Sequence, residues 1–249
     1  MIDIHSHIIY DVDDGSRTIE NSLEMLRLAA EAGTTDIVAS PHSNSEYVFQ
    51  PEVNRERIAK MQAQAPAGLR IHSGCDFHLS FENVEDAFRD PRKYTINGLN
   101  HLLVEFPDSN LIPNIEEIFE RMMGIGIFPV ITHPERNWLI QQKFETLEGW
   151  VRAGALVQVT GGSLTGRFGK PAQKFAVQII EAGICHFIAS DAHDTRDRHP
   201  QLKSAFELVS SKWGAECAER LFVTNGRAAI DGDLIATDPP KTKKRWFFF

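Results

Sequence analysis

Seven short runs of β-branched and other apolar residues divide the 249-residue chain at fairly regular intervals. Successive runs stand roughly 25–35 residues apart, which is the length of a strand, a helix and their connections. This pattern favours repeated βα units around a parallel sheet or barrel, because parallel strands need a long crossover between them. The runs cover residues 1–4, 35–39, 69–73, 101–106, 127–131, 155–159 and 186–189.

Helical spacing and glycine stops fill the intervals between the runs. After the first run, apolar residues recur every three or four positions from Ile19 to Ala30, and Gly33 follows where a left-handed C-cap is expected. The same order of helix, glycine and strand recurs later and predicts seven parallel βα units in one domain over residues 1–231. Periodicity alone leaves an open doubly wound sheet as the alternative to a barrel. The later glycines are Gly124, Gly154 and Gly183.

Composition narrows the functional classes. The chain carries 26 lysines and arginines against 34 aspartates and glutamates, a formal net charge of −8, which argues against generic nucleic-acid binding. A hydrophobic content of 42% is typical of a folded protein. Three cysteines without a short paired spacing argue against a disulfide framework or a zinc ribbon. Because neither a secretory leader nor a membrane-length apolar run is recognisable, we expect a cytoplasmic protein.

Side chains able to bind a metal follow six of the seven runs. In a parallel α/β fold, the loops after the strands meet at one end of the sheet and carry the functional groups. His5 and His7 occupy alternating positions, so their imidazoles project to the same side. The same spacing relates Asp191 and His193. The candidates are His5, His7, Asp11, Asp13, Asp14, His42, Asp76, Glu105, His133, Glu135, Asp191 and His193.

Each candidate alone also has an ordinary explanation. His42 follows a proline and fits a turn, whereas Asp76 and Glu105 suit helix N-caps. His133 suits a buried position with its hydrogen bonds met. Caps alone would scatter serine, threonine, asparagine and aspartate over the strand ends and would not select five histidines with acids between them, so the joint pattern favours a metal site. The other histidines are expected to pack or to face solvent: His72, His78, His101, His186 and His199.

Two other phosphate chemistries find no support in the sequence. A cysteine-dependent phosphatase needs an arginine six residues after its nucleophile, and none of Cys75, Cys185 and Cys217 has one. A glycine-rich loop ending in Gly-Lys-Ser or Gly-Lys-Thr is also absent, which argues against an NTPase. Gly161 and Gly162 follow the sixth run, and we expect them to form a turn.

Together these segments resemble the polymerase-and-histidinol-phosphatase (PHP) family of metallohydrolases. The resemblance is closest to the bacterial manganese-dependent protein-tyrosine phosphatases of capsule and exopolysaccharide operons. It is carried by MIDIHSHIIYDVDDGSRT at the start, SPH around His42, LLVEF around Glu105, THPER around His133 and IASDAH around Asp191. The family implies a distorted (β/α)7 TIM-like barrel of PHP type with up to three metals.

The resemblance also assigns ligands by position. Arg136 and Arg198 are similar to the family's phosphate-binding arginines. Asp76 departs from the family, which usually has glutamate there, so the bridge between two metals would rest on a side chain shorter by one methylene. The first metal site would use His5, His7, Asp76 and Asp191, the second Asp76, Glu105 and His133, and the third Asp14, His42 and His193.

The activity that the resemblance implies is metal-dependent hydrolysis of phosphotyrosine on proteins, with a bacterial tyrosine kinase as substrate and Mn²⁺ as metal. Histidine and carboxylate ligands suit iron and zinc equally well. A tyrosine leaving group, with a pKa near ~10, needs little proton assistance, and His42 or Asp194 would serve if the reaction uses a general acid. The open alternatives are a small-molecule phosphatase of the histidinol-phosphatase type and a catalytically silent PHP module that binds a partner.

Residues 232–249 form a tail that the resemblance does not explain. The tail ends in KTKKRWFFF, a basic and aromatic sequence that suits peripheral contact with anionic lipid. We favour a free end, or an aromatic plug packed on this or a neighbouring subunit, over contact with a membrane. The sequence leaves the oligomeric state open.

Overall fold

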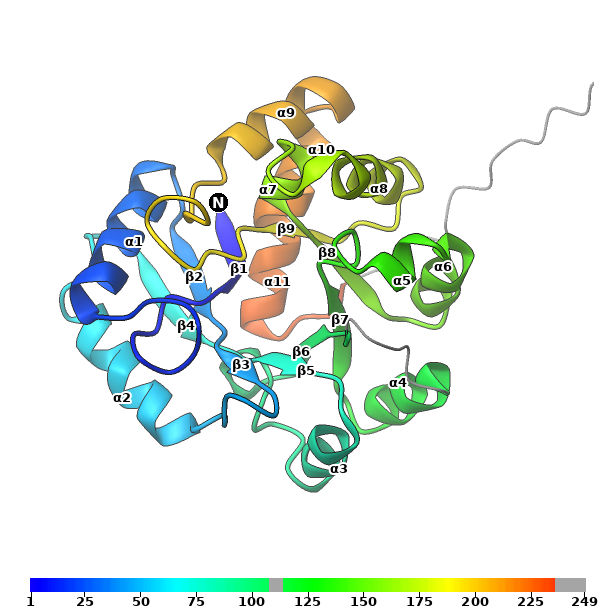
Figure 1. Ribbon diagram of the computed structural model, residues 1–249, viewed down its shortest axis with the longest axis horizontal. Coiled ribbons are helices and arrows are strands. Elements are labelled where there is room, and N and C mark those ends of the chain that lie inside the picture. Colours follow the sequence, from blue (N-terminus) through cyan, green and yellow to red (C-terminus); the bar gives the residue numbers. More distant parts are fainter. Residues whose placement is uncertain (108–113, 236–249) are drawn as a thin grey trace, which may run out of the picture.

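The computed structural model describes residues 1–107 and 114–235, so the basic and aromatic end of the tail lies outside the described residues. Strands and helices alternate around a ring, with most helices on its outside (Figure 1). The strands are β1 (Ile2–Ser6), β2 (Asp36–Ala39), β3 (His42–Ser43), β4 (Arg70–Ser73), β5 (Asp76–His78), β6 (His101–Glu105), β7 (Phe128–Thr132), β8 (Leu156–Thr160) and β9 (Phe187–Ala189).

Helices connect most of the successive strands, except β2 to β3 and β4 to β5. Over the described residues, none of them combines the length and the apolar character that crossing a membrane requires. They are α1 (Ile19–Glu31), α2 (Pro51–Gln62), α3 (Phe81–Arg89), α4 (Ile115–Gly124), α5 (Trp138–Gln141), α6 (Phe144–Arg152), α7 (Gly161–Leu164), α8 (Gly169–Glu181), α9 (Lys203–Trp213), α10 (Ala215–Glu219) and α11 (Asn225–Asp231), with the short helices η1 (Ile96–Gly98) and η2 (Arg220–Thr224).

The strands follow one another around the ring in sequence order, and all pairs are parallel. One sheet joins β1, β2 and β4, and the other joins β3, β5, β6, β7, β8 and β9. Because β3 continues β2 and β5 continues β4, the strands occupy seven positions, which are those of the seven apolar runs. β9 and β1 meet where Ser6 pairs with Ala192 and the Asp191 N–H donates to the His5 carbonyl over 2.9 Å. The predicted (β/α)7 barrel is confirmed, whereas the open doubly wound sheet is not observed.

An apolar layer fills one end of the barrel. Ile2, Leu103 and Leu156 point into it from three strands and are buried. Ile230 of α11 belongs to the same layer, and Figure 1 shows α11 crossing the ring. A Cβ at Gly226 of α11 would lie 2.9 Å from Ile2 Cβ, so only glycine lets this helix approach β1 so closely. The apolar layer leaves the opposite end of the barrel for polar side chains.

Side-chain caps begin two of the outer helices, and left-handed glycines follow α1, α6 and α8 as predicted. Gly124, in contrast, is the last residue of α4, and the left-handed glycine after this helix is Gly126. Thr18 Oγ1 accepts a hydrogen bond from the Asn21 N–H at the start of α1, and Ser80 Oγ accepts one from the Asn83 N–H at the start of α3. Such caps each stabilise a helix by about 1 kcal/mol. Gly33 ends α1 with a positive φ of 92°, as its position predicts.

Candidate metal centre

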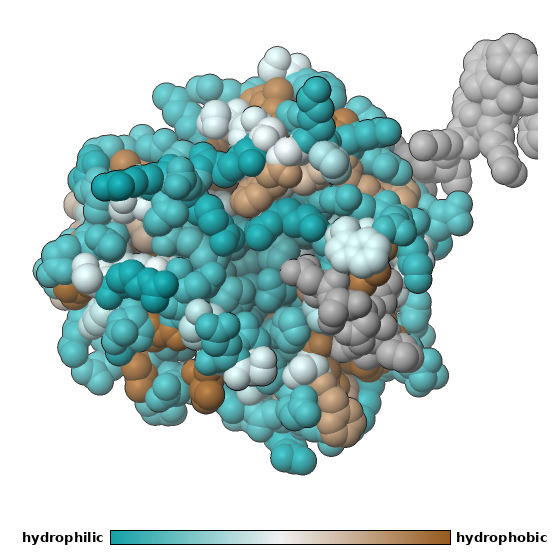
Figure 2. Space-filling view, in the orientation of Figure 1, coloured by the Kyte–Doolittle hydropathy of each residue, from teal (hydrophilic) through white to brown (hydrophobic). Residues whose placement is uncertain are grey.

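The predicted metal ligands gather at the polar end of the barrel. Figure 2 shows this face hollowed at its centre, with hydrophilic residues around the hollow. Three overlapping groups have potential ligand atoms within 4.8 Å of one another. They are His7, Asp14, His42 and His193; His5, His7 and Asp76; and His42, Asp76 and Glu105.

In the innermost group, two buried imidazoles face each other. His5 Nε2 lies 3.2 Å from His7 Nε2. Asp76 Oδ2 and Asp191 Oδ1 lie 3.5 Å and 3.6 Å from the same His5 nitrogen. Two ring nitrogens and two carboxylates thus converge on one point, which a cation can share among them.

Two side chains fix these rings: Asp13, which was a candidate without an assigned ligand role, and Gln158, which the sequence analysis missed. His5 Nδ1 lies 2.9 Å from Gln158 Oε1, and His7 Nδ1 lies 2.7 Å from Asp13 Oδ2. Since each Nδ1 donates to an oxygen, each Nε2 is left with a lone pair for a metal. Gln158 is a polar residue inside an apolar strand, and Asp13 belongs to the acidic stretch after the first run, so both carried a signal.

Asp76 and His42 connect this group to the outer ones. His42 Nδ1 lies 3.2 Å from Asp76 Oδ2 and 3.6 Å from Glu105 Oε2. Asp14 Oδ1 lies 3.5 Å from His42 Nε2 and 3.4 Å from His193 Nε2. Two strand positions of the barrel are each broken into two segments, β2 with β3 and β4 with β5. His42 begins β3 and Asp76 begins β5, and the two residues pair in register, which brings their side chains together.

Asp191 and His133 lie beside these groups in strained backbone conformations. Asp191 has a φ of 51° and His133 a φ of 34°, values that residues other than glycine seldom adopt. Asp191 Oδ1 lies 3.5 Å from His7 Nε2, and His133 Nε2 lies 3.6 Å from Glu105 Oε1. Strain of this kind collects at functional sites, where the surrounding structure maintains it.

Burial and charge shift the pKa values of the clustered histidines in opposite directions. Burial lowers the pKa of His5, but the carboxylates of Asp76 and Asp191 outweigh it and raise the value to about 9. Burial likewise opposes the rise at His42, which Asp76 brings to about 10. Burial lowers the pKa of His193 to about 4. The carboxylates therefore favour a positive charge at the centre of the site, next to His5 and His42. At His193 burial outweighs them and the neutral ring is favoured.

The two predicted phosphate-binding arginines flank the metal centre. Arg198 Nη2 donates to Asp191 Oδ2 over 2.6 Å, and the Arg136 guanidinium donates to the same oxygen. Arg136 also lies over the Phe168 ring, 4.5 Å from its centroid. A cavity of about 110 Å³ adjoins the arginine, and it is lined by Glu105, Phe106, Thr132, His133, Arg136 and Asn137.

A cluster of histidines and carboxylates flanked by two arginines is what the sequence resemblance anticipated, and the match to a known family decides which family this chain belongs to. Residues 1–231 match the family described as capsular polysaccharide synthesis, CpsB/CapC. This chain belongs to the CpsB/CapC family. The tyrosine-protein phosphatase YwqE of Bacillus subtilis (strain 168) is 32% identical over 249 residues, covering 98% of this chain and 97% of YwqE.

Two further comparisons agree with the CpsB/CapC assignment. The tyrosine-protein phosphatase CpsB of Streptococcus pneumoniae is 28% identical over 244 residues, which cover 94% of this chain and all of CpsB. The structure also matches crystal structures described as those of YwqE and CpsB, unique metal-dependent tyrosine phosphatases, with a TM-score of 0.89 at 32% identity over 98% of this chain. The resemblance drawn from the sequence is confirmed.

The donor atoms of this CpsB/CapC chain fit divalent metals. Asp76 Oδ2 and His42 Nδ1 are buried and 3.2 Å apart, but they are not aligned for a hydrogen bond and have no other hydrogen-bond partner among the described residues, although buried polar atoms normally have one. All the predicted ligand atoms are imidazole nitrogens or carboxylate oxygens, which manganese, iron and zinc all accept as ligands. The individual ligand roles of the nine predicted residues, and the phosphate-binding roles of Arg136 and Arg198, stay predictions.

Proposed function

We propose that this chain is a metal-dependent protein-tyrosine phosphatase that acts on a bacterial tyrosine kinase of capsular or exopolysaccharide synthesis. The observation that carries the proposal is the convergence of three overlapping histidine and carboxylate groups beside two arginines. The names of the CpsB/CapC relatives support phosphotyrosine as the substrate. Mn²⁺ as the metal and the cytoplasm as the compartment belong to the same proposal.

The arginines are placed to bind the phosphoryl group. Arg136 and Arg198 both donate to Asp191, so their guanidinium planes converge at the edge of the metal centre. A guanidinium stays charged and offers paired donors, which suit phosphoryl oxygens. Phe168 supports the Arg136 guanidinium from one side. When bound, divalent metals would lower the pKa of a water molecule to give a nucleophile at neutral pH and would act as Lewis acids on the phosphoryl oxygens.

Departure of the tyrosine oxygen needs little help from the protein, since its pKa is near ~10. Asp194 is poorly suited to donate a proton. Burial raises its pKa, but hydrogen bonds from the backbone N–H groups of Arg196 and Arg198 outweigh burial and lower it, so the carboxylate stays ionised at neutral pH. His42 is therefore the candidate general acid, in competition with its predicted role as a metal ligand.

The test compares substrates and variants in one assay. Protein purified without added metal would be titrated with Mn²⁺, Fe²⁺ or Zn²⁺ and assayed on a phosphotyrosine peptide and on histidinol phosphate. We expect turnover of the peptide, with Mn²⁺ giving the highest rate. His5→Ala should lose both bound metal and turnover, whereas Arg136→Ala should keep its metal and lose about 10²–10³-fold in kcat/KM, as when a group that stabilises transition-state charge is removed.

Three results would contradict the proposal. Preferred turnover of histidinol phosphate would assign the chain to small-molecule phosphatases. Full metal binding without turnover of either substrate would favour the silent binding module. Near-normal turnover by metal-free His5→Ala would separate the activity from the predicted metal centre.

A further inference from the structure

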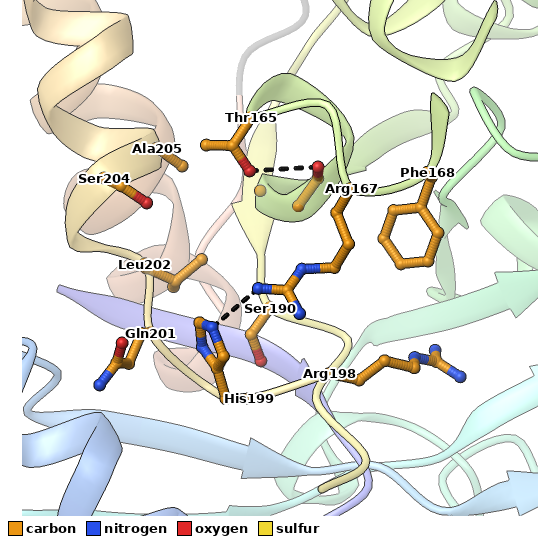
Figure 3. Close-up of a pocket in the computed structure, with 12 residues that line it drawn as sticks. Thr165, Arg167, Phe168, Ser190, Arg198, His199, Gln201, Leu202, Ser204 and Ala205 are labelled. Atoms are coloured by element: carbon orange, nitrogen blue, oxygen red, sulfur yellow. Dashed lines mark hydrogen bonds between the residues drawn. The ribbon is translucent and has the colours of Figure 1, made fainter. Parts of the chain in front are cut away.

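One strand position of the barrel supplies no metal ligand, and a second small cavity opens beside it. β8 runs directly into the segment 161–169, with the sequence GGSLTGRFG. Figure 3 shows Arg167 and Phe168 of this segment facing Arg198 and His199, which follow β9. These four side chains and Ser190 help to line a cavity of about 30 Å³, which we call the recognition pocket.

The recognition pocket is positive in a protein that is acidic overall. Two arginines and a histidine line it, and no aspartate or glutamate does. Arg167 has no carboxylate within ion-pair distance among residues 1–107 and 114–235, and its Nη2 instead donates to His199 Nε2 over 2.7 Å. Because Nε2 accepts, the proton of a neutral His199 lies on Nδ1, a buried atom without a hydrogen-bond partner. The pocket thus holds positive charge that no carboxylate among its lining residues neutralises.

The same pocket adjoins the predicted phosphate position. Arg198 lines it and also donates to Asp191 Oδ2 over 2.6 Å. Phe168 lines it and also supports the Arg136 guanidinium. A group bound in the pocket would therefore lie next to a phosphoryl group held by Arg136 and Arg198, which places it on the same substrate molecule.

The size of the pocket limits what that group can be. A cavity of about 10–15 Å³ holds one water, so about 30 Å³ holds two. Two water positions match the two oxygens of a carboxylate. Charge and size together favour an aspartate or glutamate side chain.

Glycine at position 162 keeps this pocket open. A Cβ there would lie 3.1 Å from Phe168 Cε2 and 3.2 Å from Arg167 Cδ, which is tighter than ordinary contact. The expected turn at Gly161 and Gly162 is instead the start of the short helix α7, whose backbone passes close under both side chains. The absence of a side chain at Gly162 therefore lets Arg167 and Phe168 pack against the start of α7.

We propose that Arg167 and His199 form a subsite for a carboxylate near the phosphotyrosine of the protein substrate, and that the subsite makes the phosphatase prefer acidic flanking sequences. This inference rests on the proposed function. Arg167 supplies the charge, and His199 holds the guanidinium in place. Both act on binding of the flanking residue, so their effect differs from that of Arg136.

The test measures preference with peptides. Phosphotyrosine peptides that carry glutamate at one of the three positions on either side would be compared with glutamine counterparts, using kcat/KM of the Mn²⁺-loaded enzyme. At one position or more, glutamate should be preferred by about tenfold, the effect of one charge-assisted hydrogen bond. Arg167→Ala should bring this ratio close to one, and Arg167→Glu should favour a lysine peptide. Lys170→Ala, which removes the same charge from the exposed start of α8, should keep the ratio of the parent.

Several outcomes would overturn the subsite. They are a parent enzyme without preference, an Arg167→Ala variant that keeps the preference, and an equal loss in Lys170→Ala, which would indicate general attraction. A peptide with a second phosphotyrosine in place of glutamate distinguishes the anion, since a preference for the second phosphate would replace the carboxylate. Because the glutamine peptide reports phosphotyrosine hydrolysis by itself, a failure of the proposed function would show as no turnover of any peptide.

Discussion

Three aspartates in one loop of the metal centre have three different environments. The Asp13 side chain is buried and accepts from His7 Nδ1, whereas Asp14 is 42% exposed and reaches His42 and His193. Asp11 is 77% exposed and faces Arg57. The sequence identified the acidic stretch, but which carboxylate turns inward depends on the path of the loop. Alternation along a strand predicts where His5 and His7 point, and no such rule holds for a loop.

Asp13 offers a prediction about a residue that acts through another. Its Oδ2 accepts from both His7 Nδ1 and the His42 N–H, and its Oδ1 from the Gly15 N–H. In Asp13→Asn, an NH₂ group that cannot accept a hydrogen bond replaces one of these two accepting oxygens, and the negative charge is lost. His7 should therefore be held less firmly in its orientation. Metal affinity should fall by about 10–100-fold, with most of kcat restored at saturating metal. Titration of activity with Mn²⁺ measures both values.

Asp11→Asn is the matched control for Asp13→Asn. Asp11 has a positive φ of 54°, which asparagine tolerates, and its side chain lies at the surface. Its metal affinity should equal that of the parent. Equal metal affinity in Asp13→Asn and the parent would remove Asp13 from any role in holding His7.

At the scale of elements, apolar runs located the seven strands to within a residue or two but missed two interruptions. Pro41 separates β2 from β3, because proline has no N–H to donate to the ladder. The segment beyond each break carries a site residue, His42 or Asp76. A run of apolar residues shows where a strand lies in the core, and it does not show that the strand bends just before its functional residue.

The contact between α11 and β1 yields a prediction about packing. Gly226→Ala would place a methyl group 2.9 Å from Ile2 Cβ, close to the backbone, where the neighbour cannot move away cheaply. Despite the better helix propensity of alanine, the free energy of unfolding should fall by about 1–3 kcal/mol. Urea unfolding followed by circular dichroism measures it.

Gly124→Ala is the matched control for this packing prediction. Gly124 also lies in a helix, and nothing stands within 4 Å of where its Cβ would be. Its stability should stay unchanged or rise by up to about 1 kcal/mol. If Gly226→Ala were as stable as Gly124→Ala, α11 would not be held against β1 as closely as described.

At the scale of the whole molecule, closure of the ring explains why the metal centre was predictable and the recognition pocket was not. Parallel strands bring their ends together, so side chains from distant runs meet, and residue types at those ends predicted which histidines and carboxylates would cluster. Arg167 and His199 are 32 residues apart, and both lie in loops outside the strands. Their contact follows from how the two loops fold over the barrel end, which periodicity does not report.

The metal centre should also control how stability depends on pH. In metal-free protein, Asp76 and Asp191 raise the pKa of His5 to about 9, and Asp76 raises that of His42 to about 10. A raised folded-state pKa stabilises the protein fully below the unfolded value of about 6.5, and this stability is lost as pH rises toward 9. Metals bind only the deprotonated rings, so the stabilisation by metal should grow over the same range.

Thermal unfolding at pH 6.5, 7.5 and 8.5 tests this, with EDTA or with excess Mn²⁺. With EDTA, Tm should fall as pH rises, and the increase in Tm on adding Mn²⁺ should be largest at pH 8.5. His5→Gln keeps a polar side chain but removes one titrating ring, so its EDTA profile should be flatter than that of the parent. The buried carboxylates would then be left with less compensating charge at low pH, and Tm at pH 6.5 should drop most. A parent whose Tm with EDTA rises from pH 6.5 to 8.5, in parallel with His5→Gln, would show that the clustered carboxylates do not hold a proton on His5.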